Sequence, residues 1–486
     1  MKFINKIKNL HKYKLFIIFI FQNNLLLILC SNYISFKLEN YNNNLIKNIP
    51  EESFTFEHFI NLTIQNNIYT SIKIGTPKQE IKVWIDSDEY SYFLYKNTCI
   101  LESYFNENIS LTFESNEKET FFYKGYGEAI YINETFILND NVNEKNKEIK
   151  IYKFPIMFMR DPKNDKRFNQ IHSIEDITNK TCATIGFSYM PSYNDKNSKN
   201  FIISLKEKEI IDDYIIFIEY DNNGNEKFLI VGGFPEEIFN NQYSIKRQYT
   251  TYIKFYYEYI YQWGLNFDKI SSGEEGKIYQ VDAAFHYNLG VIYAVKEYQS
   301  YIEKAFFNYY LNLKICQKLV YKSYCSYVCD KDKFNYDEMK KFPDLKFIKA
   351  DIEETFILIY EDLFFIKGNK VYFLVVFHNI LNKVWELGKP FLKKYSFAFN
   401  FDSKIIWYYK KDNYKENDIN NNPYKNSYIK SNIILFLIII ILSIALGVLC
   451  FSFGRIIYKK NKKKLIKAEE LNDDLNIQNY EYKNIN

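Results

Sequence analysis

Over most of its length the chain consists of short apolar runs separated by polar turns. Between about residues 55 and 410, runs rich in Ile, Val, Tyr and Phe alternate with clusters of Asn, Asp, Gly and Ser. In many runs every second residue is apolar, which is typical of a β-strand that buries one face. Clear examples are residues 69–74, 81–85, 214–220 and 395–399. The pattern therefore predicts an all-β protein.

Few segments depart from this pattern. Residues 296–313 and 336–341 are expected to be helical, and the polar segments 139–148 and 193–200 are expected to be surface loops. A chain of 486 residues is too long for one ordinary domain. We therefore expect two compact lobes with appendages.

An apolar segment near each end predicts secretion and membrane attachment. Lysines precede an apolar run at residues 15–30, which is the pattern of a secretory signal or signal anchor over residues 1–32. A buried core helix is the alternative for this segment. Residues 432–454 carry no charge, and the run is long enough to cross the roughly 30 Å hydrocarbon core of a bilayer. One C-terminal transmembrane helix is expected there.

Basic residues set the expected orientation of this helix. The positive-inside rule places the tail, residues 455–486, in the cytosol, because it opens with Arg455, Lys459, Lys460, Lys462, Lys463 and Lys464. Residues 411–431, rich in Asn and Lys, are expected to form a solvated stalk. The prediction is a single-pass type I protein of the secretory pathway or cell surface. Its luminal part contains sequons for glycosylation at Asn61, Asn108, Asn133 and Asn179.

Composition and charge exclude little else. The 45 Tyr and 43 Phe, with heavy use of Asn, Lys and Ile, match the codon usage of an AT-rich genome and carry no functional information. A formal charge of +4 from 63 basic and 59 acidic residues is not the strongly basic balance typical of a nucleic-acid-binding protein, so no nucleic-acid partner is expected. No motif for a metal, nucleotide or redox cofactor is present, so no cofactor is expected.

The cysteines predict one local disulfide. Cys30 belongs to the signal and Cys450 to the membrane span. An odd number of luminal cysteines remains, so at least one is unpaired or intermolecular: Cys99, Cys182, Cys316, Cys325 and Cys329. We expect the close trio 316, 325 and 329 to hold one disulfide in an oxidising compartment. Its spacing lacks the second ligand pair of a zinc site.

One segment carries a candidate catalytic residue. Residues 69–86 place an Ile-Gly-Thr-Pro turn between two strand-like runs and end in Asp86, which Ser-Asp-Glu follows. This resembles the opening of the pepsin-like aspartic proteases, where the second strand delivers the first catalytic aspartate in an Asp-Thr-Gly-Ser motif. Tyr-Phe-Leu at 92–94 stands where the family has Leu-Trp-Val, and Cys99 stands at the family's cysteine spacing.

Further segments resemble family motifs in the same order. They are residues 183–188, 228–233, 261–270, 342–347 and 385–402, the last containing Trp-Glu-Leu-Gly where the family has Trp-Ile-Leu-Gly. The resemblance implies an all-β, bilobal pepsin-like fold with an interlobe cleft. Its N-terminal lobe would span residues 55–235 and its C-terminal lobe residues 236–410. A peptide or protein would be the ligand.

The second catalytic motif departs from the family. Aligning residues 291–298 with the end of that motif puts His286 in the place of the second aspartate. Asp282 is the competing choice, but it would require an insertion in a tight turn. In the family two carboxylates share a proton, one activating a water and the other polarising the scissile carbonyl. An imidazole removes that arrangement.

Residues around the two positions are altered as well. Asp88 and Asn288 stand where each family motif has Gly. Lys-Gly-Tyr-Gly at 124–127 resembles the tip of the family's flap hairpin, with Lys124 in the place of the flap tyrosine, or Tyr123 if the hairpin shifts by one residue. Lys124 would also offset the carboxylates of Asp88 and Glu89 beside Asp86. The resemblance implies that Lys124, Tyr123, Ser87 and Tyr287 contact the substrate or ligand.

Three functions remain open from the sequence. A pseudoprotease would bind peptide or protein in the cleft without cleaving it. An unconventional endopeptidase would use Asp86 as general base and a protonated His286, paired with it, as electrophile. A surface adhesion or structural ectodomain would use another face. The ordinary two-aspartate mechanism is not expected in any of them.

Overall fold

The structure is a computed structural model, and its described residues belong almost entirely to the first of two units, residues 1–412 and 413–486. The described ranges are 32–64, 66–87, 89–95, 105–115, 120–123, 127–139, 148–159, 183–188, 200–239, 243–250, 253–254, 261–273, 276–321, 324–349, 354–378, 384–411 and residue 455. The expected signal, stalk, membrane helix and nearly all of the tail lie outside them. Within these ranges no helix has the length and apolar character needed to cross a bilayer.

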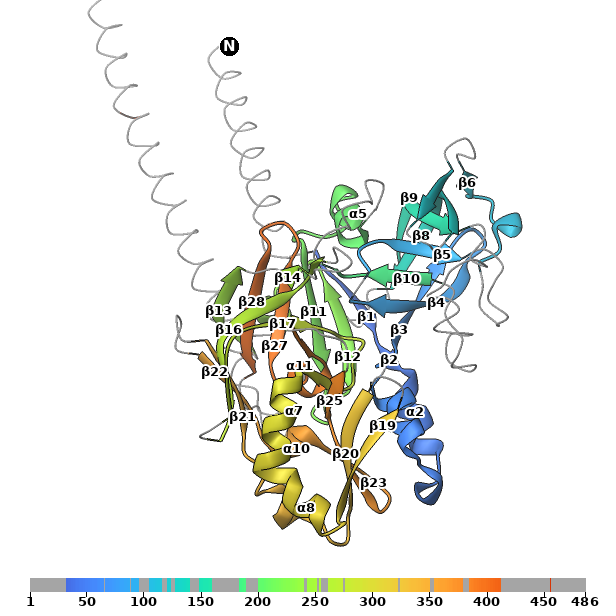
Figure 1. Cartoon of the computed structure of the whole chain (residues 1–486). Coiled ribbons are helices and arrows are strands. Elements are labelled where there is room, and N and C mark those ends of the chain that lie inside the picture. Colours follow the sequence, from blue (N-terminus) through green and yellow to red (C-terminus); the bar gives the residue numbers. More distant parts are fainter. Residues whose placement is uncertain are drawn as a thin grey trace, which may run out of the picture. The chain divides into compact units, whose positions relative to one another are not determined.

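The described part of the chain is mostly β, with curled sheets (Figure 1). The first large sheet contains the strands expected at residues 69–74 and 81–85. In spatial order it consists of β2 (Glu39–Asn40), β3 (Ile68–Ile74), β4 (Gln79–Asp86), β10 (Ala183–Gly186), β5 (Tyr92–Tyr95), β9 (Glu148–Met159), β8 (Gly127–Asn139) and β6 (Glu114–Ser115), with β7 (Phe121–Tyr123) also paired to β8. We call it the nine-stranded sheet.

The second large sheet is built from the later half of the chain. In spatial order its strands are β22 (Glu354–Leu358), β21 (Leu345–Lys349), β16 (Gly264–Ser272), β17 (Gly276–Phe285), β26 (Trp385–Leu387), β18 (Ile292–Ala294), β25 (Val375–His378), β20 (Tyr324–Asp330), β24 (Lys370–Phe373) and β23 (Phe364–Lys367), with β19 (Cys316–Tyr321) also paired to β20. We call it the eleven-stranded sheet.

A third sheet contains strands from both ends of the folded region. Its order is β1 (Ile34–Lys37), β12 (Glu226–Val231), β11 (Ile215–Tyr220), β27 (Ser396–Asn400), β28 (Ile405–Lys411) and β13 (Tyr243–Thr250). A short ribbon joins β14 (Ile253–Lys254) to β15 (Tyr261–Gln262). The strands expected at 214–220 and 395–399 are confirmed as β11 and β27.

The strands form where apolar and polar residues alternate. In β4, Ile81, Val83 and Ile85 are fully buried, while Lys82 and Trp84 between them are only partly buried. Successive side chains of a strand point to opposite faces, so this spacing gives one fully buried face.

Helices are short, and both helical segments that were expected are present. The segment predicted at 296–313 is α7 (Lys296–Ile302), a π-helical turn (Glu303–Phe307) and α8 (Asn308–Asn312). The helix predicted at 336–341 is α9 (Tyr336–Met339). The remaining helices were not expected: α2 (Tyr41–Asn48), α3 (Phe56–Phe59) with its π-helical extension (Ile60–Ile64), α5 (Phe201–Glu207), α6 (Pro235–Ile238), α10 (Tyr360–Leu363) and α11 (Lys389–Leu392).

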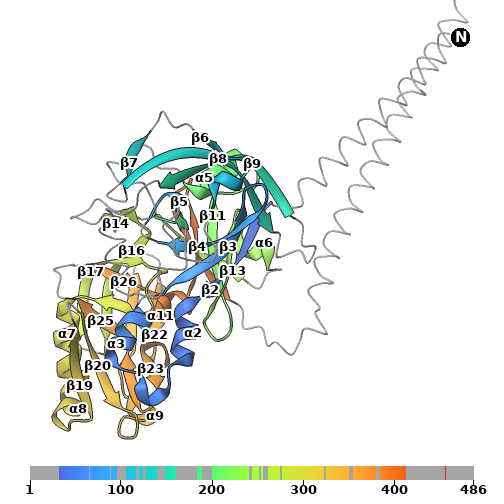
Figure 2. The ribbon, with the colours of Figure 1, turned by 90° about the vertical axis from the view of Figure 1, so that its right-hand side faces the viewer.

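The folded region begins upstream of residue 55, the expected start of the N-terminal lobe. β1 pairs with β12, and β2 pairs with β3. The helical segment that follows packs against the eleven-stranded sheet (Figures 1 and 2), where Phe59 stacks on Tyr372 with ring centroids 4.8 Å apart. Residues 34–64 are therefore part of the folded region.

The two larger sheets contain the same arrangement of strands. In the nine-stranded sheet, β10 lies between β4, to which it is parallel, and β5, to which it is antiparallel. In the eleven-stranded sheet, β26 lies in the same way between β17 and β18. The flanking pairs also correspond: β3–β4 and β16–β17 are antiparallel, and β5–β9 and β18–β25 are parallel. The chain thus contains an internal structural repeat.

The strand register makes Asp86 and His286 equivalent positions in this repeat. The central strand of the first repeat, β10, begins opposite Val83, and that of the second, β26, begins opposite Ala283. Asp86 and His286 each lie three residues further along their own strand direction. Two strand ends that are far apart in sequence therefore carry corresponding side chains.

A glycine closes the central strand in each repeat. A Cβ atom at Gly186 would lie 2.3 Å from the carbonyl oxygen of Glu89, and one at Gly388 would lie 2.2 Å from that of Val291. Such distances exclude any larger residue without a backbone shift. The close approach brings each central strand against the loop that follows Asp86 or His286.

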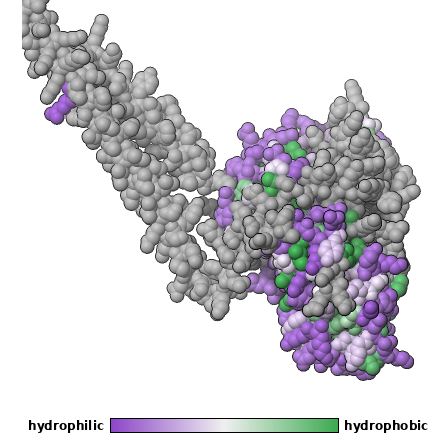
Figure 3. All heavy atoms as spheres, turned by 60° about the vertical axis from the view of Figure 1, so that its left-hand side comes forward, coloured by the Kyte–Doolittle hydropathy of each residue, from purple (hydrophilic) through white to green (hydrophobic). Residues whose placement is uncertain are grey.

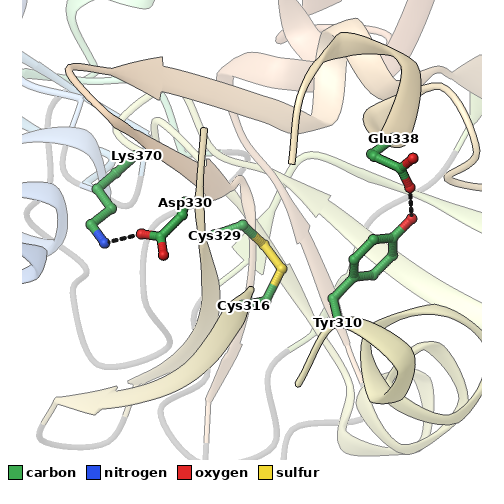
Figure 4. The surroundings of a disulfide bond; sticks show 6 residues. All are labelled: Tyr310, Cys316, Cys329, Asp330, Glu338 and Lys370. Atoms are coloured by element: carbon green, nitrogen blue, oxygen red, sulfur yellow. Dashed lines mark hydrogen bonds and ion pairs between the residues drawn. A yellow bond between two sulfur atoms is a disulfide. The ribbon is translucent and has the colours of Figure 1, made fainter. Parts of the chain in front are cut away.

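The expected local disulfide is confirmed. Cys316 and Cys329 face each other across β19 and β20 and are joined, near the Asp330–Lys370 ion pair (Figure 4). Cys325 of the same trio is a buried free thiol. Cys99 and Cys182 lie outside the described residues.

Candidate functional site

Asp86 is the last residue of β4, an inner strand of the nine-stranded sheet. Its side chain is partly buried, and its carbonyl oxygen accepts a hydrogen bond from the N–H of Phe187 at 2.8 Å. Ile85 before it is fully buried, and Ser87 after it is 5% exposed. The main chain around the carboxylate is therefore held from both sides.

His286 lies at the corresponding place beside a carboxylate that was not predicted. Its side chain is 7% exposed, and Nε2 lies 3.9 Å from Glu386 Oε2. Glu386 is the middle residue of β26, between the fully buried Trp385 and Leu387, so it points to the opposite face. The sequence feature that could have identified Glu386 is a charged residue between the apolar residues Trp and Leu. The two side chains form an ion pair whenever the imidazole is protonated.

One of two stacked tyrosines lies beside Glu386. Tyr293 of β18 lies opposite Glu386 in the sheet and stacks on Tyr324 with ring centroids 5.7 Å apart. Burial raises the pKa of Tyr293 well above its usual value, and Tyr324 and then Glu386 add to the rise. The phenol is therefore neutral throughout the range in which an imidazole titrates.

The turn after His286 reaches across to Asp86 through one amide side chain. The N–H and the hydroxyl of Ser87 both donate to Asn288 Oδ1, each at 2.8 Å. Asn288 Nδ2 donates in turn to the carbonyl oxygen of Ile85 at 2.6 Å. We call these three hydrogen bonds the Asn288 clasp. They join the ends of the two repeats.

The main chain of this turn is held by the N-terminal segment. The N–H of Asn66 donates to Asn288 O at 2.7 Å, and its side-chain amide donates to Tyr287 O at 2.7 Å. The N–H of Gly290 donates to Ile64 O at 2.8 Å. Sequence reasoning had assigned no role to residues 64–66.

A buried ion pair lies behind Asn66. Glu226 of β12 accepts a hydrogen bond from the Asn66 amide at 2.9 Å and from Lys389 Nζ at 3.1 Å. The Glu226 side chain is fully buried, and that of Lys389 is 17% exposed. A buried carboxylate requires such partners, because its desolvation is otherwise uncompensated. The pair thus supports the turn that carries Asn288.

The residues predicted to contact a ligand lie in different surroundings in the structure. Ser87 is part of the Asn288 clasp, so its hydroxyl is already hydrogen-bonded. Tyr287 is 4% exposed and packs edge-on against Phe399 in the core, and burial raises the pKa of its phenol well above the usual value. Tyr123 ends β7 and pairs with Gly127 of β8. Lys124 lies outside the described residues, as does Asp88.

Two further carboxylates are placed by the structure. Glu89 is fully buried, and its Oε1 accepts hydrogen bonds from the N–H groups of Tyr90 at 2.8 Å and Ser91 at 3.0 Å, so it stabilises its own loop. Asp282 is exposed within β17 and accepts a hydrogen bond from Asn266 at 2.8 Å. Asp282 thus lies on a strand surface, whereas His286 follows the strand end.

Comparison with known proteins adds no relative. No protein-family model and no curated protein matches the chain. In the part of the chain that the structure describes, no cluster of three or more His, Cys, Asp or Glu side chains could hold a metal ion. What the site can do follows from Asp86, His286, Glu386 and the clasp.

Proposed function

We propose that the chain is a divergent member of the pepsin-like aspartic protease family that binds a peptide or protein segment between its two repeats without cleaving it. The internal repeat supports this proposal, because it gives Asp86 and His286 the corresponding places that two aspartates take in the family. The ordered motifs from residue 69 to residue 402 support it as well.

The equivalence of Asp86 and His286 carries the catalytic part of the proposal. A proton shared between two carboxylates activates the water in the ordinary mechanism. Here the second position holds an imidazole that pairs with Glu386 instead. The hydroxyl beside Asp86 is occupied by Asn288. The imidazole takes the place of the second carboxylate that the shared-proton mechanism needs, and the strand framework is intact.

The ligand class follows from the family and the expected topology. We propose that residues 432–454 anchor the chain in a membrane and that the folded region lies in a lumen or outside the cell. Secretory and surface proteins are then the accessible ligands. On the face in Figure 3 the described surface is mainly hydrophilic with small separate apolar patches, which suits a folded region that meets water.

An unconventional endopeptidase is the second candidate, and the His286–Glu386 pair favours it. Glu386 would be the counter-ion of a protonated His286, which can donate a hydrogen bond to a carbonyl oxygen. Asp86 would take the proton of an attacking water as general base.

Incubating the full-length chain with a diverse peptide library from acid to neutral pH tests both candidates. Bound peptides would be recovered by cross-linking, and cleaved ones by mass spectrometry. We expect retention without cleavage, weakened in Asp86→Ala and His286→Ala and unchanged in Asn266→Ala, a surface control. Cleavage that both site variants abolish would establish the endopeptidase. If the folded chain neither binds nor cleaves any peptide, the proposed site is overturned.

A further inference from the structure

The turn after His286 is paired with another segment of the same chain in the way that two strands pair. The N–H of Asn66 donates to Asn288 O at 2.7 Å. Further along the turn, the N–H of Gly290 donates to Ile64 O at 2.8 Å. The two segments thus run in opposite directions and exchange donor and acceptor at the same spacing, which is the pattern of an antiparallel strand pair. The chain itself therefore supplies a strand to the main chain beside His286.

This pairing leaves little main chain at the turn for a ligand to bind. The carbonyl oxygen between the two bonded positions is used as well, because Leu289 O accepts a hydrogen bond from the N–H of Lys389 at 2.7 Å. A peptide that adds to the edge of a sheet gains its affinity from main-chain hydrogen bonds. A ligand can make such bonds beside His286 only where Ile64 and Asn66 have left the turn.

Ile64 is the last residue of a helical excursion between β2 and β3, which we define as residues 41–64. The strands at its two ends lie together, because Asn40 pairs with Ile68 and its side-chain amide donates to Asn66 Oδ1. The side chains of Asn40 and Asn66 also both donate to the buried Glu226. A segment whose ends meet in this way can undock while the flanking strands stay paired.

Apolar side chains dock the excursion on the eleven-stranded sheet (Figure 2). Phe59 is fully buried and stacks on Tyr372, and Phe54 meets the same ring edge-on with centroids 5.5 Å apart. The buried cluster that contains these rings also contains Ile64 of the excursion and Val291, the residue after the turn. The contacts that dock the helices therefore also hold Ile64 beside the turn.

We propose that the helical excursion is an internal competitor of the peptide ligand. Docked, it occupies the main chain beside His286, and undocked it leaves that edge to an extended peptide. The competition rests on the function proposed above, whereas the docking rests on the excursion's own contacts. The apparent affinity for peptide is then the intrinsic affinity multiplied by the fraction of undocked chains.

Hydrogen exchange of the ligand-free, full-length chain tests the docking. Phe59→Ala weakens it and leaves every residue of the turn unchanged. We expect the Asn66 and Gly290 amides to exchange about tenfold faster in this variant, because the excursion undocks more often. Phe217→Ala is the matched control, since Phe217 is equally buried but packs on Tyr243 near the third sheet. Unchanged exchange of both amides in a folded Phe59→Ala would overturn the proposal.

Peptide affinity of the same chains tests the competition. With the peptide library used above, we expect the apparent Kd to fall about tenfold in Phe59→Ala, in step with the faster exchange, and to stay unchanged in Phe217→Ala. Faster exchange with an unchanged Kd would overturn the competition alone. If no chain binds peptide, the proposed function fails and the competition with it, and the exchange rates still decide the docking. Phe56→Ala, which removes a half-buried ring stacked on Phe59, replaces Phe59→Ala if that variant does not fold.

Discussion

His286 Nε2 lies 3.9 Å from Glu386 Oε2, and both side chains are largely buried. The strand repeat explains why they meet. His286 follows β17, and β26 runs parallel to β17 with Glu386 opposite Ala284. The carboxylate that lies beside the His286 imidazole therefore comes from the neighbouring strand of its own sheet.

Glu386→Gln is expected to destabilise the native chain more than a chain that already carries His286→Ala. Glu386 Oε2 lies 3.9 Å from His286 Nε2, so part of the effect of removing the carboxylate depends on the imidazole. Contacting residues couple by about 1 kcal/mol in such double-mutant cycles. Urea denaturation of the four chains measures the coupling.

Glu219→Gln is the matched control for that experiment. Glu219 lies 3.8 Å from Lys227 Nζ, a similar separation, but its partner is not His286. The effect of Glu219→Gln should therefore be the same in the native and the His286→Ala chain. A Glu386→Gln effect of equal size in both chains would contradict an interaction with His286.

Lys389→Met should lower stability by about 3 kcal/mol, because it leaves the fully buried Glu226 carboxylate without its cation. Lys370→Met is the control, since its ion pair with Asp330 is partly exposed and should contribute no more than about 1 kcal/mol. Denaturation curves of both variants give the comparison. Equal losses of stability in the two variants would show that burial of Glu226 does not determine how much its ion pair contributes to stability.

Local pattern predicted the strands, whereas long-range pairing decides the site. Alternation in β4 is visible within eight residues, so its bounds could be predicted closely. The choice between Asp282 and His286 depends on where β26 pairs, about a hundred residues later, and no local pattern contains that register. The roles of Glu386 and Asn288 depend on the same tertiary contacts.

The N-terminal helices were missed for a related reason. Tyr41–Asn48 is rich in Asn, so its sequence favours a turn as much as a helix. Packing stabilises the N-terminal helices: Ile46 packs against the buried cluster that contains Tyr372, and Phe59 stacks on Tyr372. Most helical stability in proteins comes from such contacts rather than from intrinsic propensity.

Gly186→Ala should destabilise the fold by about 3 kcal/mol, because the added methyl group would lie 2.3 Å from Glu89 O and force the backbone to move. Gly388→Ala should behave alike, since it would meet Val291 O at 2.2 Å. Gly273→Ala is the control, with a cost of about 1 kcal/mol from its positive φ and no backbone atom in the way. Thermal unfolding ranks the three. A Gly186→Ala loss no larger than that of Gly273→Ala would contradict the close approach.

Loss of the Cys316–Cys329 disulfide should cost about 3 kcal/mol, because the bond closes a loop with a sequence separation of 13. Replacing both cysteines by Ser and measuring urea denaturation tests this. Cys325→Ser is the control, since this thiol is unpaired and its loss opens no loop.

Cys325 should also resist alkylation in the folded chain. Burial raises the pKa of its thiol, so the thiolate that reacts is scarcer at any given pH than for an exposed cysteine. Labelling at mildly alkaline pH, followed by peptide mapping, should modify Cys325 only after denaturation. Rapid modification of Cys325 in the native chain would contradict its buried placement in β20 between β19 and β25, where Gln299 Nε2 lies 3.3 Å from its sulfur.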